Sequence, residues 1–166
     1  MGKVEENKKR KREALLNAAF SLFTSQGVYR TSISDIAKKA DIAKGTFYRY
    51  FSDKYDIRDQ LIISKATQLF YHATQEMKEK GMEEPGAYTL EDGIIFIADT
   101  VINELEADKR LLVFIAKNLS WGVFHNLMVS SNEDSGYSFY DGYQTMLEQS
   151  GRKFRNPELM LYMIVE

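Results

Sequence analysis

The fold is decided by residues 31–54, which read TSISDIAKKADIAKGTFYRYFSDK. Ser32 and Asp35 have the spacing of a capping box, so we expect a short helix to begin here and to end before Asp41. After a three-residue turn, a second helix is predicted over Lys44–Phe51. Two short helices joined by such a turn are typical of the helix-turn-helix motif, which places its second helix on DNA.

The motif has the two kinds of side chain that a DNA reader needs. Small and apolar residues allow the helices to cross closely and hold their angle: Ile36, Ala37, Ala40, Ile42, Phe47 and Phe51. The outward face of the second helix must then meet phosphates and base edges. Lys44 and Arg49 suit phosphates or guanine acceptors. Thr46 suits either partner, and Tyr48 is long enough to reach phosphate oxygens.

This stretch resembles the DNA-binding signature of TetR-family transcriptional regulators. The residues in register are Ile36, Ala37, Ala40, Gly45, Thr46, Tyr48, Tyr50, Phe51 and Lys54. The resemblance covers about the first 60 residues and is only architectural beyond them. It implies an N-terminal three-helix helix-turn-helix DNA-binding domain over residues 1–52, with a basic tail at 1–12. A helical ligand-binding and dimerisation domain would follow over residues 53–166.

Helical periodicity runs through the rest of the chain, so an all-α protein is expected. An amphipathic helix precedes the motif and ends at Gly27, and further helices are predicted over 53–80, 90–106, 108–128 and 139–149 and from Asn156. A polar break is expected at 130–136. The chain stops at Glu166 inside an apolar run. Whether it is truncated there and still dimerises stays open at this point.

Two positions depart from the family pattern. Asp41 stands where the family has a turn glycine, and we expect the turn to survive because Asp tolerates a left-handed backbone. Ala43 replaces a serine before the second helix of the motif and has no side-chain cap to offer.

We expect DNA contacts from nine residues, four of which (Lys44, Thr46, Tyr48 and Lys54) match DNA-contacting positions of the family. Gly45 is expected to allow close approach of the DNA backbone or of a neighbouring helix. Ser32 is equally explained as a helix cap. The full set is Ser32, Ser34, Lys44, Gly45, Thr46, Tyr48, Arg49, Tyr50 and Lys54.

Charge and composition narrow the function further. Residues 1–58 carry 13 Lys and Arg against 7 Asp and Glu, whereas the remainder carries 9 against 17, so a polyanionic partner is expected for the first part only. Two His and no Cys predict no metal site, and no catalytic motif or cofactor loop is recognisable, so we do not expect an enzyme. No apolar run of 18 residues occurs, which predicts a cytoplasmic protein without a membrane span.

The second part of the chain is rich in aromatic residues, as a pocket for a partly apolar small molecule requires. The effector-binding candidates are Phe96, Trp121, Phe124 and His125. The resemblance implies a homodimeric, ligand-responsive regulator, and we expect a repressor that a small-molecule effector releases from a palindromic operator. The alternative is a helical interaction or adaptor protein without specific DNA binding.

Overall fold

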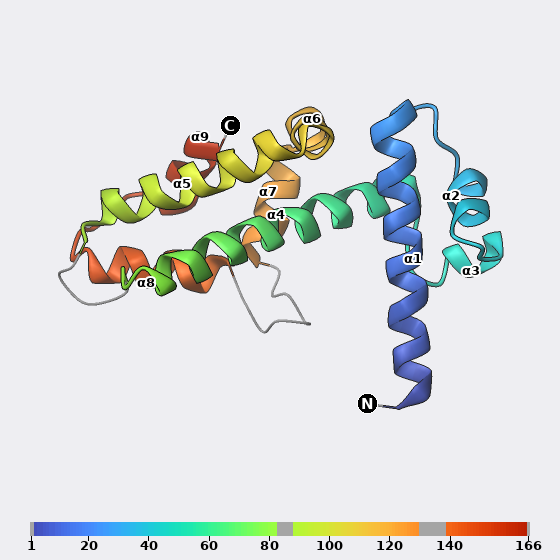
Figure 1. The fold of residues 1–166 in the computed structure, drawn as a ribbon, viewed down its shortest axis with the longest axis horizontal. Coiled ribbons are helices and arrows are strands. Elements are labelled where there is room, and N and C mark those ends of the chain that lie inside the picture. The colour runs from blue at the N-terminus through green and yellow to red at the C-terminus, as the bar shows by residue number, and fades with distance from the viewer. Residues whose placement is uncertain (1, 83–87, 130–138, 166) are drawn as a thin grey trace. The chain divides into compact units, whose positions relative to one another are not determined.

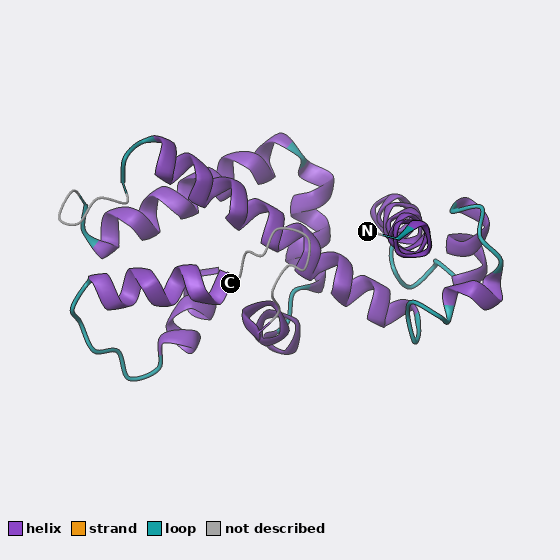
Figure 2. Ribbon diagram, turned by 90° about the horizontal axis from the view of Figure 1, so that it is seen from below, coloured by secondary structure: helices purple, strands orange, loops and turns teal. Residues whose placement is uncertain are grey.

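The computed structural model describes residues 2–82, 88–129 and 139–165, and every regular element in these ranges is a helix (Figure 1). The same part of the chain holds only helices and loops when coloured by secondary structure (Figure 2). The all-α prediction is therefore confirmed. Contacts divide the chain into two compact units. Unit 1 is Met1–Ile62 with Arg110–Asn118, and unit 2 is Ile63–Lys109 with Leu119–Glu166.

Unit 1 contains the N-terminal helices. They are α1 (Lys3–Gln26), α2 (Ile33–Lys39), α3 (Lys44–Phe47) and the start of α4 (Lys54–Glu79), and α6 (Lys109–Asn118) belongs to the same unit from Arg110 onward. Their buried apolar side chains form one core, which includes Leu15, Ala19, Phe23, Ile36, Phe47, Phe51, Ile57 and Ile62. The first helix ends as expected at Gly27, whose φ of 85° is readily adopted only by glycine.

Helix α6 joins unit 1 through one aromatic side chain. Phe114 is buried and meets two rings of α1: Phe20 edge-on at 5.8 Å and Phe23 in a stacked arrangement at 6.2 Å between centroids. A segment about 90 residues beyond α1 in the sequence thus completes the core of the N-terminal unit.

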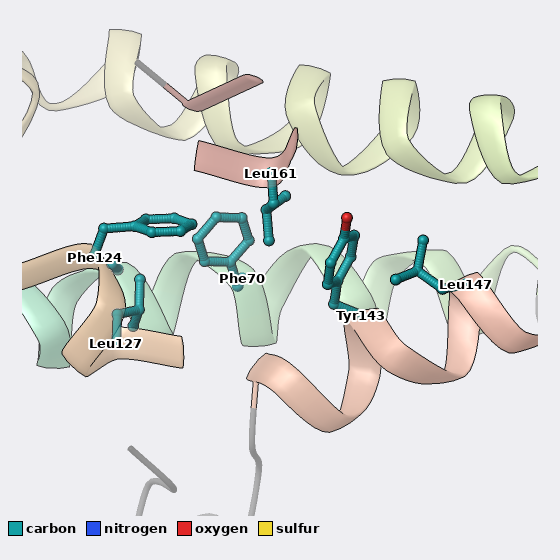
Figure 3. Packing of buried hydrophobic residues seen from close by; sticks show 7 residues of the cluster. Phe70, Phe124, Leu127, Tyr143, Leu147 and Leu161 are labelled. Carbon is teal, nitrogen blue, oxygen red and sulfur yellow. The ribbon is translucent and has the colours of Figure 1, made fainter. Parts of the chain in front are cut away.

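Unit 2 contains the remainder of α4 with α5 (Leu90–Ala107), α7 (Trp121–Val129), α8 (Phe139–Gln149) and α9 (Pro157–Val165). Its core draws one or two side chains from each of several helices, namely Ala66, Phe70, Phe124, Leu127, Tyr143, Leu147 and Leu161 (Figure 3). The hydroxyl of Tyr143 donates a hydrogen bond of 2.9 Å to the carbonyl of Pro157, which connects α8 to the start of α9. Burial raises the pKa of this phenol to about 12, and Tyr140 contributes to the rise.

The single helix expected over 108–128 is wrong, because the structure interrupts it between Asn118 and Trp121. The Asn118 side chain donates to the carbonyl of Phe114 at 2.7 Å and so competes for the last turn of α6. The Ser120 carbonyl accepts from the amide of Phe124 at 2.8 Å, and its hydroxyl accepts from the amide of Val123 at 3.4 Å. Two local polar side chains therefore end one helix and begin the next.

Two further boundaries differ from expectation. Helix α3 ends at Phe47, and the amides of Arg49 and Tyr50 donate to the third residue before them, a tighter pattern than that of an α-helix. Helix α1 begins at Lys3, so the basic run at 8–12, expected as a tail, is helical. The expected polar break at 130–136 and the end at Glu166 lie outside the described residues. None of the described helices has the length and apolar character needed to span a membrane.

Candidate nucleic-acid interface

The turn between α2 and α3 has the hydrogen bonds of a Schellman motif. The amide of Ile42 donates to the carbonyl of Ala37 at 2.9 Å, and the amide of Asp41 donates to that of Lys38 at 3.2 Å. Asp41 has a φ of 55°, the only positive value among the described residues other than glycine. The expectation that Asp accepts the left-handed position is confirmed.

The start of α2 is held by a reciprocal cap. The Ser32 hydroxyl accepts from the amide of Asp35 at 3.1 Å, and the Asp35 carboxylate accepts from the amide of Ser32 at 2.9 Å. The Ser32 hydroxyl also donates to the Asp35 carboxylate at 2.7 Å, and this bond, followed by the one from the Ser32 amide, holds the pKa of the Asp35 carboxyl below its ordinary value of 3.8. The capping interpretation of Ser32 is thus confirmed, while Ser34 is exposed one residue into α2.

Helix α3 separates inner from outer side chains sharply. Phe47 and Phe51 are buried in the core of unit 1, with ring centroids 5.6 Å apart. The exposed positions are Lys44, Gly45, Tyr48 and Arg49, whereas Thr46 and Tyr50 are half-buried. Tyr48 keeps 53% of its surface accessible, although its ring lies edge-on to Phe47 at 5.6 Å. An ammonium, three hydroxyl groups and a guanidinium are therefore brought together on or beside one short helix.

Gly45 lies in the open on this face. A Cβ atom built there would meet nothing within 4 Å, so no neighbouring helix among the described residues requires a glycine. Of the two explanations expected for Gly45, close approach of an external backbone is the one that this geometry favours. Ala43, before α3, makes no side-chain cap, as expected.

Lys54 differs from the other candidates in its surroundings. Its ammonium donates to three carbonyls of the connector between α1 and α2, those of Val28, Tyr29 and Thr31, at 3.1–3.3 Å. It also lies 5.6 Å from the centroid of the Tyr29 ring. The three donors of a lysine are thus all engaged within the protein. Lys54 holds the connector that leads into α2, and its charge stays close to the motif.

The effector-binding candidates are only partly brought together. Trp121 stacks on Phe124 at 6.0 Å and lies 6.3 Å from His125, and Tyr162 of α9 meets the Trp121 ring edge-on at 4.9 Å. Phe124 is fully buried in the core, whereas Trp121 and His125 are exposed. Sequence reasoning missed Tyr162 as a member of this cluster.

Phe96 lies apart from that cluster, half-buried, with the Lys80 ammonium 4.6 Å from its ring centroid. A cavity of about 450 Å³ occupies another part of unit 2, and none of the four effector-binding candidates lines it. Its walls come from α4, α5, α8 and the segments beside them, and they include Met77, Met82, Leu90, Gly93, Met146 and Arg152. Methionines spaced as ordinary core positions carry no sequence signal for a cavity, which is why these residues were not anticipated.

Known proteins resemble this chain most clearly in unit 1. Residues 15–61 match the family model described as bacterial regulatory proteins, tetR family. The chain is 30% identical over 139 residues to the uncharacterized HTH-type transcriptional regulator YvdT of Bacillus subtilis (strain 168), covering 84% of this chain and 64% of that protein. It is 33% identical over 75 residues to the fatty acid metabolism regulator protein of the same organism, covering 45% and 39%. The chain therefore spans less than two thirds of the length of these relatives.

Solved structures share the fold of the whole described chain. The fatty acid degradation regulator FadR of Bacillus halodurans superposes with a TM-score of 0.61 at 20% identity, covering 93% of this chain and 78% of that one. FadR of Bacillus subtilis, solved in complex with stearoyl-CoA, gives 0.53 at 21% identity, covering 92% and 80%. At these identities the likeness establishes the architecture alone.

Proposed function

Because this chain belongs to the TetR family of bacterial regulatory proteins, we propose that it regulates transcription by binding double-stranded DNA through α2 and α3. The observation that carries the proposal is the exposed face of α3. Lys44, Gly45 and Tyr48 point away from a core that the same helix fills with Phe47. A major groove is wide enough to admit such a helix, and these groups match phosphates and base edges.

Each proposed contact has a physical role. Thr46 and Arg49 read base edges or bind phosphates, and Lys44 neutralises a phosphate. Tyr48 donates its hydroxyl to a phosphate oxygen, and Tyr50 adds a second phenol from the turn after α3. Gly45 allows the DNA backbone to come close, in keeping with the open space around it. The N-terminal side of α2 adds Ser32 and Ser34. Lys54 keeps the connector to α2 in place and adds positive charge beside the site.

The proposed regulator acts as a homodimer on a palindromic operator, since two copies present two α3 helices to half-sites about 34–36 Å apart. Unit 2 receives a partly apolar small molecule, and its binding shifts the population away from the state that fits the operator. The buried position of Phe114 supports this coupling, because α6 lies between two segments of unit 2 in the sequence and packs in unit 1.

The DNA part of the proposal is tested by selecting sites from a random duplex pool with the whole chain and measuring the affinity of the selected operator. Tyr48→Phe removes only the hydroxyl, and we expect it to weaken binding by about 1.5–3 kcal/mol, the worth of a hydrogen bond to a charged group. Tyr88→Phe, on an exposed tyrosine of unit 2, is the matched control and leaves the affinity unchanged. A pool that yields no enriched sequence would contradict the proposal and favour the adaptor alternative.

The effector part is tested by adding candidate ligands to the operator complex at fixed salt. Acyl-CoA thioesters of graded chain length are the first series, because the named relatives include regulators of fatty acid metabolism and a stearoyl-CoA complex. A repressor of the proposed kind is released from DNA as the ligand is added. A ligand that binds the protein and leaves its affinity for the operator unchanged would contradict the proposed release from DNA.

A further inference from the structure

The N-terminal part of α1 contributes no buried side chain to the core of unit 1. Residues 3–14 are exposed except for Lys11 and Ala14, which are half-buried, and the first fully buried side chain of the helix is Leu15. Figure 1 shows this part of α1 continuing past the level of α3 within unit 1. A helical segment that buries no apolar surface is marginally stable by itself in water, so a role in the core does not account for it.

This segment carries a large excess of positive over negative charge. Five consecutive cations occupy residues 8–12, and at 100° per residue they surround the helix on every side. Two local contacts of this run join exposed groups: Lys8 pairs with Glu5 at 3.9 Å, and Arg10 donates to the Asn7 side chain at 3.2 Å. Such surface pairs neutralise little of the charge. Like charges on neighbouring turns repel, and a polyanion would relieve that repulsion.

Arg12 fixes the segment against the DNA-reading motif. Its guanidinium donates to the side chain of Gln60 in α4 at 2.6 Å and lies 5.7 Å from the ring centroid of Phe51. Phe51 is buried directly after the turn that follows α3. The basic segment therefore leaves the core beside the motif, in a direction set by contacts with the elements that hold α3.

We propose that residues 8–11 bind the phosphate backbone of the same DNA, on base pairs flanking those that α3 reads. This inference rests on the proposed function. Backbone contacts of this kind add affinity without sequence preference, because phosphates are the same at every base pair. An interfacial membrane helix needs an apolar face, and residues 3–14 offer only Val4 and Ala14, so a lipid surface does not fit.

The test compares two triple variants of equal charge change. The first carries Lys8→Gln, Lys9→Gln and Lys11→Gln; the second carries Lys109→Gln, Lys153→Gln and Arg155→Gln, three exposed cations of unit 2. Lys and Gln have similar helix propensities, so the first variant is expected to keep its circular dichroism. Binding to the selected operator is measured by fluorescence anisotropy at a series of KCl concentrations.

Because log K decreases as log salt increases, we expect the magnitude of this negative slope to fall by about 0.9 for each lost phosphate contact, hence by about 2–3 in the first variant. The second variant keeps the parent slope, and the affinity ratio of operator to scrambled DNA is the same in all three proteins. Shortening the duplex to the α3 half-sites lowers the parent affinity and leaves the first variant unchanged. Equal slopes in the parent and the first variant overturn the inference, as does a first variant that loses sequence discrimination.

Hydrogen exchange on the parent protein gives a readout that needs no variant. Amides of residues 4–13 become protected when the full-length operator is added, and unchanged exchange there overturns the inference. If instead an acidic protein, and not DNA, protects these amides, the inference also fails. Failure of the proposed function is a different result, since the parent itself then shows no preference for any DNA sequence.

Discussion

The ring of Phe114 in α6 stacks on the ring of Phe23 in α1, with centroids 6.2 Å apart and planes inclined by 11°. The two residues are 91 positions apart in the chain, yet both are buried in unit 1. Helix α6 is therefore part of the structure that supports the DNA-reading motif, although the helices before and after it belong to unit 2.

Phe114→Ala is expected to lower the free energy of unfolding by about 3–5 kcal/mol, because a buried aromatic side chain is lost and a cavity remains. Urea unfolding followed by circular dichroism measures the effect. Val113→Ala, one residue earlier and 47% exposed, is the control and should stay within about 0.5 kcal/mol of the parent. Equal losses in the two variants would show that Phe114 does not hold α6 in the core.

Asp41 supplies the left-handed residue of the turn before α3. Asp41→Ala is expected to destabilise the protein by about 1 kcal/mol, since a Cβ without a polar partner is disfavoured at positive φ. Asp41→Gly is expected to remain within about 0.5 kcal/mol of the parent, because relief of strain and added freedom of the unfolded chain nearly cancel. Thermal and urea unfolding of both variants check the order, and an Ala variant as stable as the Gly variant would contradict it.

The cap of α2 predicts a pH dependence. Hydrogen bonds from Ser32 lower the pKa of Asp35 in the folded protein below 3.8, so its stabilisation is present above that pH and is lost as the pH falls through the folded value. Asp35→Asn should therefore be less stable than the parent at pH 7, with a smaller difference near pH 3. In a Ser32→Ala background this pH dependence should become smaller, because the bond from the hydroxyl is lost while the amide of residue 32 still donates to the carboxylate. Urea unfolding at the two pH values tests it, and a constant difference would argue against the cap.

Tyr143→Phe removes the hydrogen bond to the Pro157 carbonyl and is expected to cost about 0.5–1.5 kcal/mol at pH 7. The pKa of Tyr143 is raised to about 12 in the folded protein, so its contribution is complete below pH 10 and is lost as the pH rises toward 12. The difference between parent and variant should then shrink over that range. Tyr140→Phe on the same helix is the control, and an equal loss there would contradict the assignment.

Local patterns account for most of the helix boundaries that were predicted. Ser32 with Asp35, Gly27 after α1 and Asn156 before Pro157 all act within four residues, and each is observed in its expected role. The break between α6 and α7 also depends on nearby residues, but there the sequence contains two opposing patterns. The apolar residues around Asn118 and Ser120 continue a helical period, whereas the two polar side chains interrupt it.

The candidate site also has features that could be predicted from the sequence and features that could not. The exposed and buried faces of α3 follow from helical spacing, so Tyr48 and Phe47 could be assigned from sequence. The engagement of Lys54 with carbonyls 23–26 residues earlier could not, because nothing in the order of residues says where a flexible side chain finds its acceptors. The methionine-lined cavity also depends on how α4, α5 and α8 pack, and Met77 and Met146 have the spacing of core residues.

The order of residues was enough to predict most of the helices, the turn at Asp41 and the chemistry on the outer face of α3, since these depend on neighbours within a few residues. Only the tertiary structure decided that Phe114 belongs to unit 1 and that Arg12 reaches Gln60, 48 residues away. The reason is that burial of apolar surface is non-directional. The type of a hydrophobic or cationic side chain predicts that it will be buried or paired. Which residue it contacts is determined only when the chain folds.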